Sequence, residues 1–258
     1  MAFREANLGR LVKFNSAASS DFIDAYEQHW ENKIAAKNAE PKHKTFAPSS
    51  FRCPRVSWFR LRGVQPDSIP VPDKTLDFSA QVGTACHENI QRNLAEMLKA
   101  DWIDVAEYLE NLKPNYKYKV EKSGFETRIE IDSPPVRFAC DGIIRWKGEL
   151  YLLEIKTSEY SSFDQLTDPK SIHLDQIKFY ASLLGLKKAL VLYQDRTYGG
   201  LKCYEVTISQ SDVEYVKNKI QYIIDMVDAN LAPERLDRTD SWCSPNMCPY
   251  YKKCKEWG

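Results

Sequence analysis

Two acids and a lysine stand among residues that otherwise predict a buried β-hairpin, in the stretch CDGIIRWKGELYLLEIKTS at residues 140–158. Lys147-Gly148 predicts a two-residue hairpin turn, because glycine readily takes positive φ. Counting outward from that turn, Asp141 stands opposite Glu154, and Lys156 follows on the same face. Two opposed carboxylates in an apolar sheet repel and lose hydration unless a cation lies between them. Oxygen ligands suit Mg²⁺ or Mn²⁺, so the hairpin predicts a divalent-metal site.

An acid-x-Lys triplet on a strand also occurs at solvated sheet edges, where it carries no chemistry. Here the second strand is apolar at the neighbouring positions of both faces, which favours burial. These positions are Leu150, Leu152, Leu153 and Ile155. A β-bulge in either strand would change the register and separate the two acids.

The composition favours one large domain, or a core with an appendage. The chain has 258 residues, of which 43% are hydrophobic and 28% charged, which argues against membrane insertion and general disorder. Lys plus Arg equals Asp plus Glu at 36 each, so nucleic-acid binding would depend on local patches. Residues 1–14 contain no apolar run of signal-peptide length, and no later segment approaches a membrane span. We therefore expect a cytoplasmic protein.

Hydrophobic periodicity predicts an α/β fold with a mixed central sheet flanked by helices on both faces. Within residues 79–99, Val82, Cys86, Ile90 and Leu94 recur at helical spacing. Helix signals continue at 101–112, after which β-rich runs begin. Further helices are expected at 19–38, 51–62, 171–185 and 210–230, and strands at 116–122, 125–131, 136–146, 149–157, 187–194 and 201–208. We divide the chain into an N-terminal helical region (1–78), a core (79–230) and a cysteine-rich tail (231–258).

The order of these motifs resembles that of PD-(D/E)XK superfamily nucleases of the RecB-like group. The "DG" at Asp141 and the "EIK" ending at Lys156 match the signature, GTACHENIQ (83–91) precedes it, and QIKFY (176–180) follows it. The resemblance implies a restriction-endonuclease-like core, in which His87, Asp141, Glu154 and the Ile155 carbonyl bind the catalytic metal.

The same resemblance implies that Lys156 orients or activates the attacking water. Gln176 and Tyr180 lie four residues apart on one helix face, and the resemblance implies that they support the lysine or contact DNA. Without the resemblance, His87 also fits an ordinary partly buried histidine, and Tyr180 an ordinary core residue.

Seven cysteines in a chain expected in the cytoplasm indicate metal binding or burial rather than disulfides. Cys243, Cys248 and Cys254 cluster in a tail that has no core of its own, and Cys53 is the best fourth ligand. The other cysteines, at 86, 140 and 203, stand within helix or strand patterns. One upstream cysteine with three near the C-terminus resembles the 4Fe–4S staple of the iron–sulfur branch of RecB-like nucleases. That branch includes AddB-type subunits, CRISPR-associated adaptation nucleases and phage relatives.

The resemblance implies that this cluster clips the N-terminal helices to the C-terminal tail. The four-residue gap between Cys243 and Cys248 departs from the family's spacing, and zinc is the alternative metal.

A basic and aromatic segment at 51–63 could contact phosphates and stack unpaired bases, with Arg52, Arg55 and Arg60 as DNA-binding candidates beside Tyr180. The alternative is a solvated helix face with a packed aromatic edge.

Together with the predicted divalent-metal site, the resemblance implies a metal-dependent DNA exonuclease with a structural 4Fe–4S cluster. The resemblance implies action on single-stranded DNA or free ends, in recombination, repair or CRISPR adaptation, with protein partners from those processes. The alternatives are a non-catalytic DNA-binding or complex-organising module of the same fold, and a zinc-stabilised adaptor.

Overall fold

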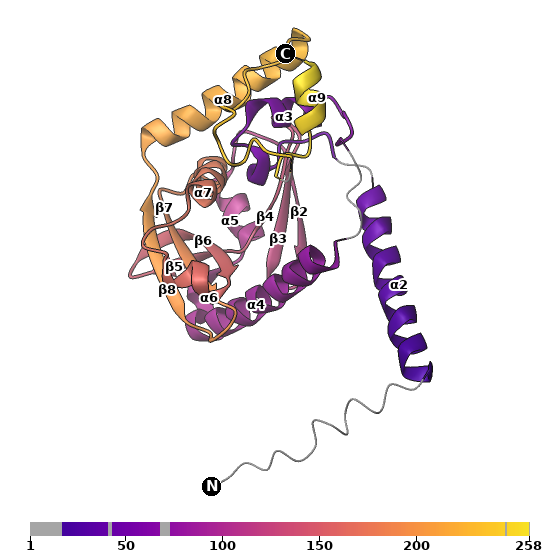
Figure 1. The fold of residues 1–258 in the computed structure, drawn as a ribbon. Helices are drawn as coiled ribbons and strands as arrows, with labels where there is room; N and C mark the ends of the chain where they lie inside the picture. The colour runs from indigo at the N-terminus through magenta and orange to yellow at the C-terminus, as the bar shows by residue number, and fades with distance from the viewer. Residues whose placement is uncertain (1–16, 41–42, 68–72, 246, 258) are drawn as a thin grey trace. The chain divides into compact units, whose positions relative to one another are not determined.

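The helices and strands form close to the residues where the sequence periodicity predicts them (Figure 1). The protein is described by a computed structural model that covers residues 17–40, 43–67, 73–245 and 247–257, and the predictions made for residues 1–14 lie outside this range. In chain order the elements are α2 (Ala17–Ala39), η2 (Pro48–Ser50), α3 (Pro54–Leu61), α4 (Lys74–Leu98), η3 (Lys99–Asp101), β1 (Trp102–Ile103), α5 (Val105–Leu112), β2 (Tyr118–Ser123), β3 (Glu126–Ile131), β4 (Val136–Cys140), β5 (Gly142–Trp146), β6 (Glu149–Ser158), α6 (Tyr160–Asp164), α7 (Ser171–Leu184), β7 (Lys188–Asp195), β8 (Leu201–Thr207), α8 (Gln210–Asp228) and α9 (Tyr251–Glu256).

The chain divides into two compact units. The smaller unit spans residues 1–41 and 69–80, and in it Trp30 Nε1 of α2 donates to Asp77 Oδ2 of α4 at 2.7 Å. The larger unit spans residues 42–68 and 81–258 and contains all the strands found in the described residues. The division into regions 1–78, 79–230 and 231–258 stays a prediction.

The larger unit contains a five-stranded mixed sheet in the order β1-β5-β6-β7-β8. Strands β6 and β7 pair in parallel, whereas the other neighbours pair antiparallel. A separate antiparallel sheet has the order β2-β3-β4. The expected α/β class with a mixed central sheet is therefore confirmed.

The predicted hairpin register is also confirmed. Lys147 and Gly148 form the two-residue turn with φ of 51° and 83°, and Trp146 pairs with Glu149. Positive φ at both turn positions matches the twist of the flanking strands, which explains the glycine. Counted outward, the pairing runs to Gly142 and Leu153 and ends there. The predicted pair of Asp141 with Glu154 therefore lies one position beyond the paired residues of β5 and β6.

The run at 136–146 was expected as one strand, but the structure divides it at Asp141. Strand β4 belongs to the small sheet and β5 to the large one, so Asp141 stands where the chain passes from one sheet to the other. In the run at 101–112 the expected helix forms as α5 from Val105 to Leu112, but Trp102 and Ile103 form the short edge strand β1. Each run is apolar enough for either assignment, so periodicity alone does not find the break.

Helices cover both faces of the large sheet, as predicted. Leu153 and Ile155 of β6 pack with Ile90 of α4, whereas Leu152 packs in a second cluster with residues of α7 such as Ile177. Because side chains alternate along a strand, Glu154 and Lys156 share the face of Leu152 and lie on the side of α7.

The C-terminal tail folds against α3. The ring of Tyr250 stacks on Phe59 at a centroid distance of 5.0 Å, and its hydroxyl donates to the Val64 carbonyl. Trp58 of α3 in turn donates from Nε1 to the Met226 carbonyl of α8 at 3.2 Å. The tail, which has too little apolar periodicity to form a core of its own, is therefore stabilised by packing against α3.

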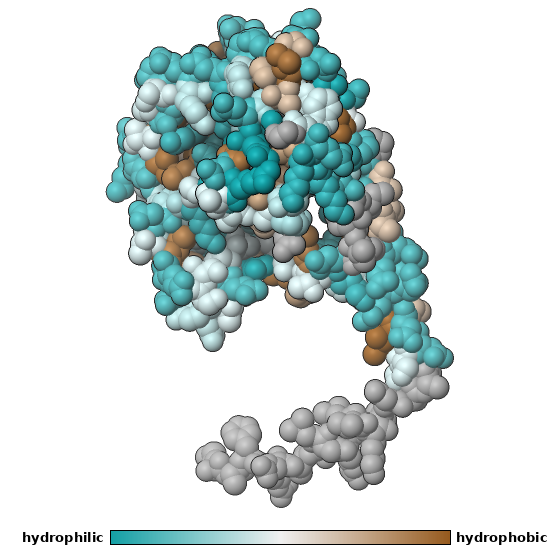
Figure 2. Space-filling model, turned by 45° about the horizontal axis from the view of Figure 1, so that its top comes forward, coloured by the Kyte–Doolittle hydropathy of each residue, from teal (hydrophilic) through white to brown (hydrophobic). Residues whose placement is uncertain are grey.

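The surface of the larger unit is chiefly polar on the face in Figure 2, where hydrophobic side chains form separate patches. Over the described ranges, no helix is both long and apolar enough to cross a membrane.

Candidate active site

Asp141 is held rigidly at the junction of the two sheets. Its side chain accepts a hydrogen bond at Oδ2 from the Ile155 amide at 2.7 Å, which joins the two strands of the hairpin. Its own carbonyl accepts from the Gln91 side chain at 2.7 Å. The second carboxylate oxygen, Oδ1, lies 3.4 Å from Nδ1 of His87. The junction therefore presents one carboxylate oxygen and one imidazole nitrogen toward each other.

Glu154 is the most deeply buried acid of the site, with 2% of its surface exposed. Burial raises the pKa of its carboxyl from 4.5 to about 7, and the neighbouring Asp141 carboxylate adds to that rise, against the attraction of Lys156 and His87. Asp141 and His87 therefore lie close enough to Glu154 to influence its charge. Asp141 adds to the electrostatic cost of ionising this buried acid, as expected for two neighbouring carboxylates.

Lys156 provides the positive charge beside these acids. Its Nζ donates to Glu154 Oε1 at 2.5 Å and to Gln176 Oε1 at 3.2 Å. Gln176 Nε2 in turn donates to the Tyr180 hydroxyl at 2.7 Å. A continuous hydrogen-bonded row therefore runs from Glu154 on β6 to Tyr180 on α7.

Tyr180 belongs both to the core and to this row. Only 5% of its surface is exposed, and its ring stacks on Phe138 at a centroid distance of 4.8 Å. Burial, reinforced by the nearby Glu154 carboxylate, raises the pKa of its hydroxyl well above the ordinary value. The hydroxyl is therefore a neutral donor and acceptor at physiological pH.

The site brings together His87, Asp141, Glu154, Lys156, Gln176 and Tyr180 from α4, the sheet junction, β6 and α7. As the side chains stand, no group of three or more His, Cys, Asp or Glu within the described ranges is spaced to hold a metal ion. The ammonium of Lys156 is the positive charge that contacts Glu154. The Ile155 carbonyl stays a predicted ligand, and the structure adds that the amide of the same residue binds Asp141.

Gln91 contributes to the site without being predicted. It is 2% exposed and holds the backbone at Asp141 from α4. Its position four residues after His87, on the same helix face, is the sequence signal that could have indicated it.

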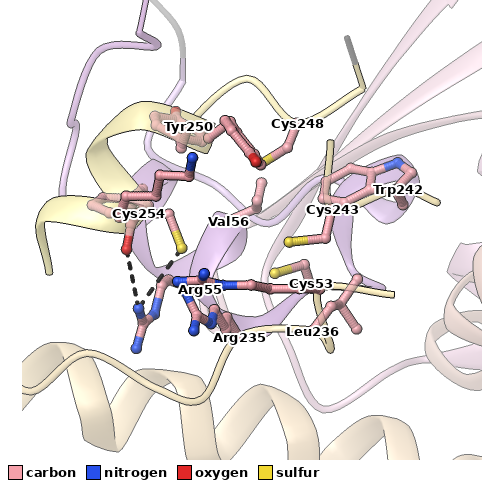
Figure 3. Close-up of a pocket in the computed structure, with 14 residues that line it drawn as sticks. Cys53, Arg55, Val56, Arg235, Leu236, Trp242, Cys243, Cys248, Tyr250 and Cys254 are labelled. Carbon is pink, nitrogen blue, oxygen red and sulfur yellow. Dashed lines mark hydrogen bonds between the residues drawn. The ribbon is translucent and has the colours of Figure 1, made fainter. Parts of the chain in front are cut away.

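The four cysteines predicted as cluster ligands line one cavity of about 20 Å³, between α3 and the C-terminal tail (Figure 3). They are Cys53, Cys243, Cys248 and Cys254. In Figure 3 the side chains of Cys53 and Cys243 lie side by side, with their sulfurs pointing in the same direction. Burial, reinforced by the three other thiols, raises the pKa of the Cys248 thiol to about 11.

Positive charges surround this cysteine cavity. Its lining residues include four cationic side chains, those of Arg55, Arg235, Arg238 and Lys255. Within the described part of the chain, no Asp or Glu lines the cavity. Arg55 is 7% exposed and donates from Nη1 toward Cys254 Sγ at 3.7 Å. Four sulfur donors with cations around them are the donor set and charge balance that a thiolate-bound metal requires.

The arginines predicted to bind DNA have partners within the protein. Arg52 Nη2 donates to Asp240 Oδ2 at 2.7 Å, and Nη1 donates to Ser171 Oγ at 3.1 Å. Arg55 Nε donates to the Pro233 carbonyl at 2.8 Å, so this residue packs the tail. Arg60 Nε donates to the Thr45 carbonyl, and burial lowers the pKa of its guanidinium. Their contact with DNA stays a prediction.

Comparisons with known proteins give low similarity. No family model matches the chain, and no curated protein matches it. Among solved structures, SSO0001 is similar over 86% of this chain and 93% of its own, with 13% identity and a TM-score of 0.45. The alkaline exonuclease LHK-Exo of Laribacter hongkongensis is similar over 79% and 93%, with 13% identity and a TM-score of 0.43. Its complex with dAMP gives 15% identity over the same shares and a TM-score of 0.43. These TM-scores lie below 0.5, so the function proposed below depends on the geometry of the chain itself.

Proposed function

We propose that the protein is a divalent-metal-dependent deoxyribonuclease of the PD-(D/E)XK type. The observation that carries the proposal is the gathering of two buried acids, a histidine and a lysine at one sheet junction, with Gln176 and Tyr180 linked to the lysine. A binding scaffold gains nothing from a buried pair of like charges, whereas metal-assisted hydrolysis requires one.

Asp141, Glu154 and His87 would hold Mg²⁺ or Mn²⁺, together with the Ile155 carbonyl. The donor set fits, because carboxylate oxygens and an imidazole nitrogen suit these ions and Oδ2 of Asp141 is already fixed by the Ile155 amide. When bound, such an ion lowers the pKa of water and neutralises charge that develops on a phosphate. Because burial raises the pKa of Glu154 to about 7, the ionised form that can bind a cation predominates only above that pH.

Lys156 would turn from Glu154 to the substrate once that acid holds a cation. Its ammonium would then orient the attacking water or stabilise charge on a phosphate oxygen. Gln176 accepts from Lys156 and donates to Tyr180, so the row on α7 limits the directions in which the ammonium can move. The protein thus places the ammonium of Lys156 beside the carboxylates of Asp141 and Glu154.

We also propose that the four cysteines hold a structural 4Fe–4S cluster, with zinc as the alternative. The all-sulfur donor set and the surrounding cations support a soft metal centre at this position. Arg52 supports a structural role, because it joins Asp240 of the tail to Ser171 at the start of α7. The centre would thereby steady the helix that carries Gln176.

The finer assignment is an exonuclease acting on single-stranded DNA or free ends, in recombination, repair or CRISPR adaptation. It depends on the sequence motifs around Asp141 and Lys156. The alternative role is a non-catalytic DNA-binding module of the same fold.

Labelled DNA tests the proposal. Single- and double-stranded oligonucleotides, labelled at either end, and a closed circular DNA are incubated with Mg²⁺ or Mn²⁺. We expect metal-dependent digestion of the linear substrates, which Asp141→Asn and Lys156→Ala abolish. Glu149→Gln is the matched control, since this exposed acid lies on the same strand outside the site. Digestion that both site variants retain would refute the assignment, and binding without digestion would favour the alternative.

Anaerobic purification tests the cysteine centre. We expect brown protein with iron and sulfide, which Cys53→Ser loses. Colourless protein with one zinc would replace the iron–sulfur assignment, and protein without metal would reject both.

A further inference from the structure

His173 is a third residue on the α7 face that covers the lysine. It precedes Gln176 by three residues and Tyr180 by seven, which places all three on one side of the helix. On the sheet below, Lys156 of β6 pairs in register with Tyr193 of β7, so their side chains emerge on the same face. The imidazole of His173 lies 2.7 Å by Nδ1 from the Tyr193 hydroxyl. His173 and Tyr193 therefore stand beside the ammonium of Lys156.

The hydrogen bonds of Tyr193 fix the tautomer of this imidazole. The Tyr193 hydroxyl accepts from the backbone amide of Lys170 at 3.1 Å and lies within hydrogen-bond distance of Nδ1. An amide can only donate, so the phenolic hydrogen is left to point at Nδ1. In the opposite tautomer Nδ1 would carry a hydrogen and could not accept one. The hydroxyl hydrogen of Tyr193, a side chain that is only 1% exposed, would then have no acceptor in the described part of the chain. His173 thus carries its hydrogen on Nε2.

The ring is also uncharged. Burial, together with the ammonium groups of Lys156 and Lys170, lowers the pKa of His173 to about 3. A neutral N–H donor next to a lysine can bind a phosphate oxygen without repelling the ammonium. In the described ranges no protein group pairs with Nε2, and the residue is only half-buried.

We propose that His173 is a substrate-binding residue whose Nε2–H donates to a phosphate oxygen of the strand held beside Lys156, and that Tyr193 is the positioning residue that fixes its tautomer. This inference rests on the nuclease function proposed above. It adds a neutral donor to the charged groups, and it explains why a half-buried histidine and a buried tyrosine lie next to the reactive lysine.

Kinetics of matched variants separate a substrate contact from a structural role. In His173→Gln the amide nitrogen can reach the position of Nε2, whereas in His173→Asn it can reach only that of Nδ1. We expect Gln to retain most of kcat/KM, and Asn or Leu to lose about 10- to 100-fold, the range for a hydrogen bond to a charged group. Tyr193→Phe should lower kcat/KM as well, and its effect should not add to that of His173→Leu. Retention by Asn with loss by Gln, or full activity in every variant, would overturn the proposal.

Nitrogen-15 NMR of the imidazoles tests the tautomer without any activity. The chain has four histidines, and the signal that His173→Gln removes identifies the residue. We expect a protonated Nε2 and an unprotonated Nδ1 at neutral pH, and a mixture of tautomers in Tyr193→Phe. A protonated Nδ1 in the wild type would overturn the proposal. Wild-type protein that shows the expected tautomer but digests no DNA would instead count against the nuclease function.

Discussion

Replacing Glu154 by glutamine should stabilise the fold while abolishing the activity. Burial raises the pKa of this carboxyl from 4.5 to about 7 even with Lys156 beside it. The folded protein therefore binds a proton more tightly than the unfolded chain, so its stability falls as pH rises from about 4.5 through about 7. At about 1.4 kcal/mol for each pKa unit, the ionised acid lowers the free energy of unfolding by about 3 kcal/mol above that range.

Urea denaturation of wild type and Glu154→Gln in buffer free of divalent ions measures this effect. At about pH 4.5 we expect the two free energies of unfolding to agree within about 0.5 kcal/mol, and at about pH 8.5 the variant should be more stable by about 3 kcal/mol. Glutamine keeps the shape of the side chain and an acceptor for Lys156, so packing changes little. Glu149→Gln is the control: its exposed acid has a pKa lowered by Lys188, so it should show no such gain.

A difference that does not change with pH would refute this reasoning, as would a wild type more stable than Glu154→Gln at about pH 8.5. The metal supplies a second arm of the test. Mg²⁺ at about ten times its Kd should stabilise the wild type by about 1.4 kcal/mol and leave the variant unchanged. Equal stabilisation of both proteins would place the metal elsewhere.

Other substitutions give expected outcomes along the same row and at the tail. Lys156→Ala should lower kcat by about 100-fold or more with the fold intact in circular dichroism, and Lys156→Arg should restore only part of it; full activity in Lys156→Ala would remove the lysine from the mechanism. Tyr180→Phe should cost about 1 kcal/mol of stability in urea denaturation and reduce activity about tenfold or less, so an unchanged stability would contradict the observed hydrogen bond. Arg52→Ala separates Asp240 from the start of α7, so limited proteolysis should cut the tail faster and metal should leave Cys53 and its partners sooner; identical digestion patterns would contradict the link.

The hairpin and its acids could be predicted because their geometry is local. A two-residue turn at Lys147-Gly148 determines the pairing outward as far as Gly142 and Leu153, and the alternation of side chains then places Lys156 on the face of Glu154. The positions of Gln176 and Tyr180 follow from the four-residue spacing on α7.

The exact environment of Asp141 could not be predicted in this way. The residues that flank Asp141-Gly142 are apolar and β-forming, so hydrophobic periodicity alone does not indicate that the chain leaves one sheet and enters another there. Likewise, the contacts of Arg52 and Arg55 depend on a tail nearly two hundred residues later, and a basic, aromatic helix alone indicates a surface rather than these internal partners.

The count of Mn²⁺ ions bound at the sheet junction tests the central claim most directly. Electron paramagnetic resonance of free Mn²⁺ during titration, in protein whose cysteine centre is first characterised, gives that count. We predict at least one bound Mn²⁺ in the wild type, its loss in the double variant Asp141→Asn, Glu154→Gln, and its retention in Glu149→Gln. Equal Mn²⁺ binding by all three proteins would contradict the account.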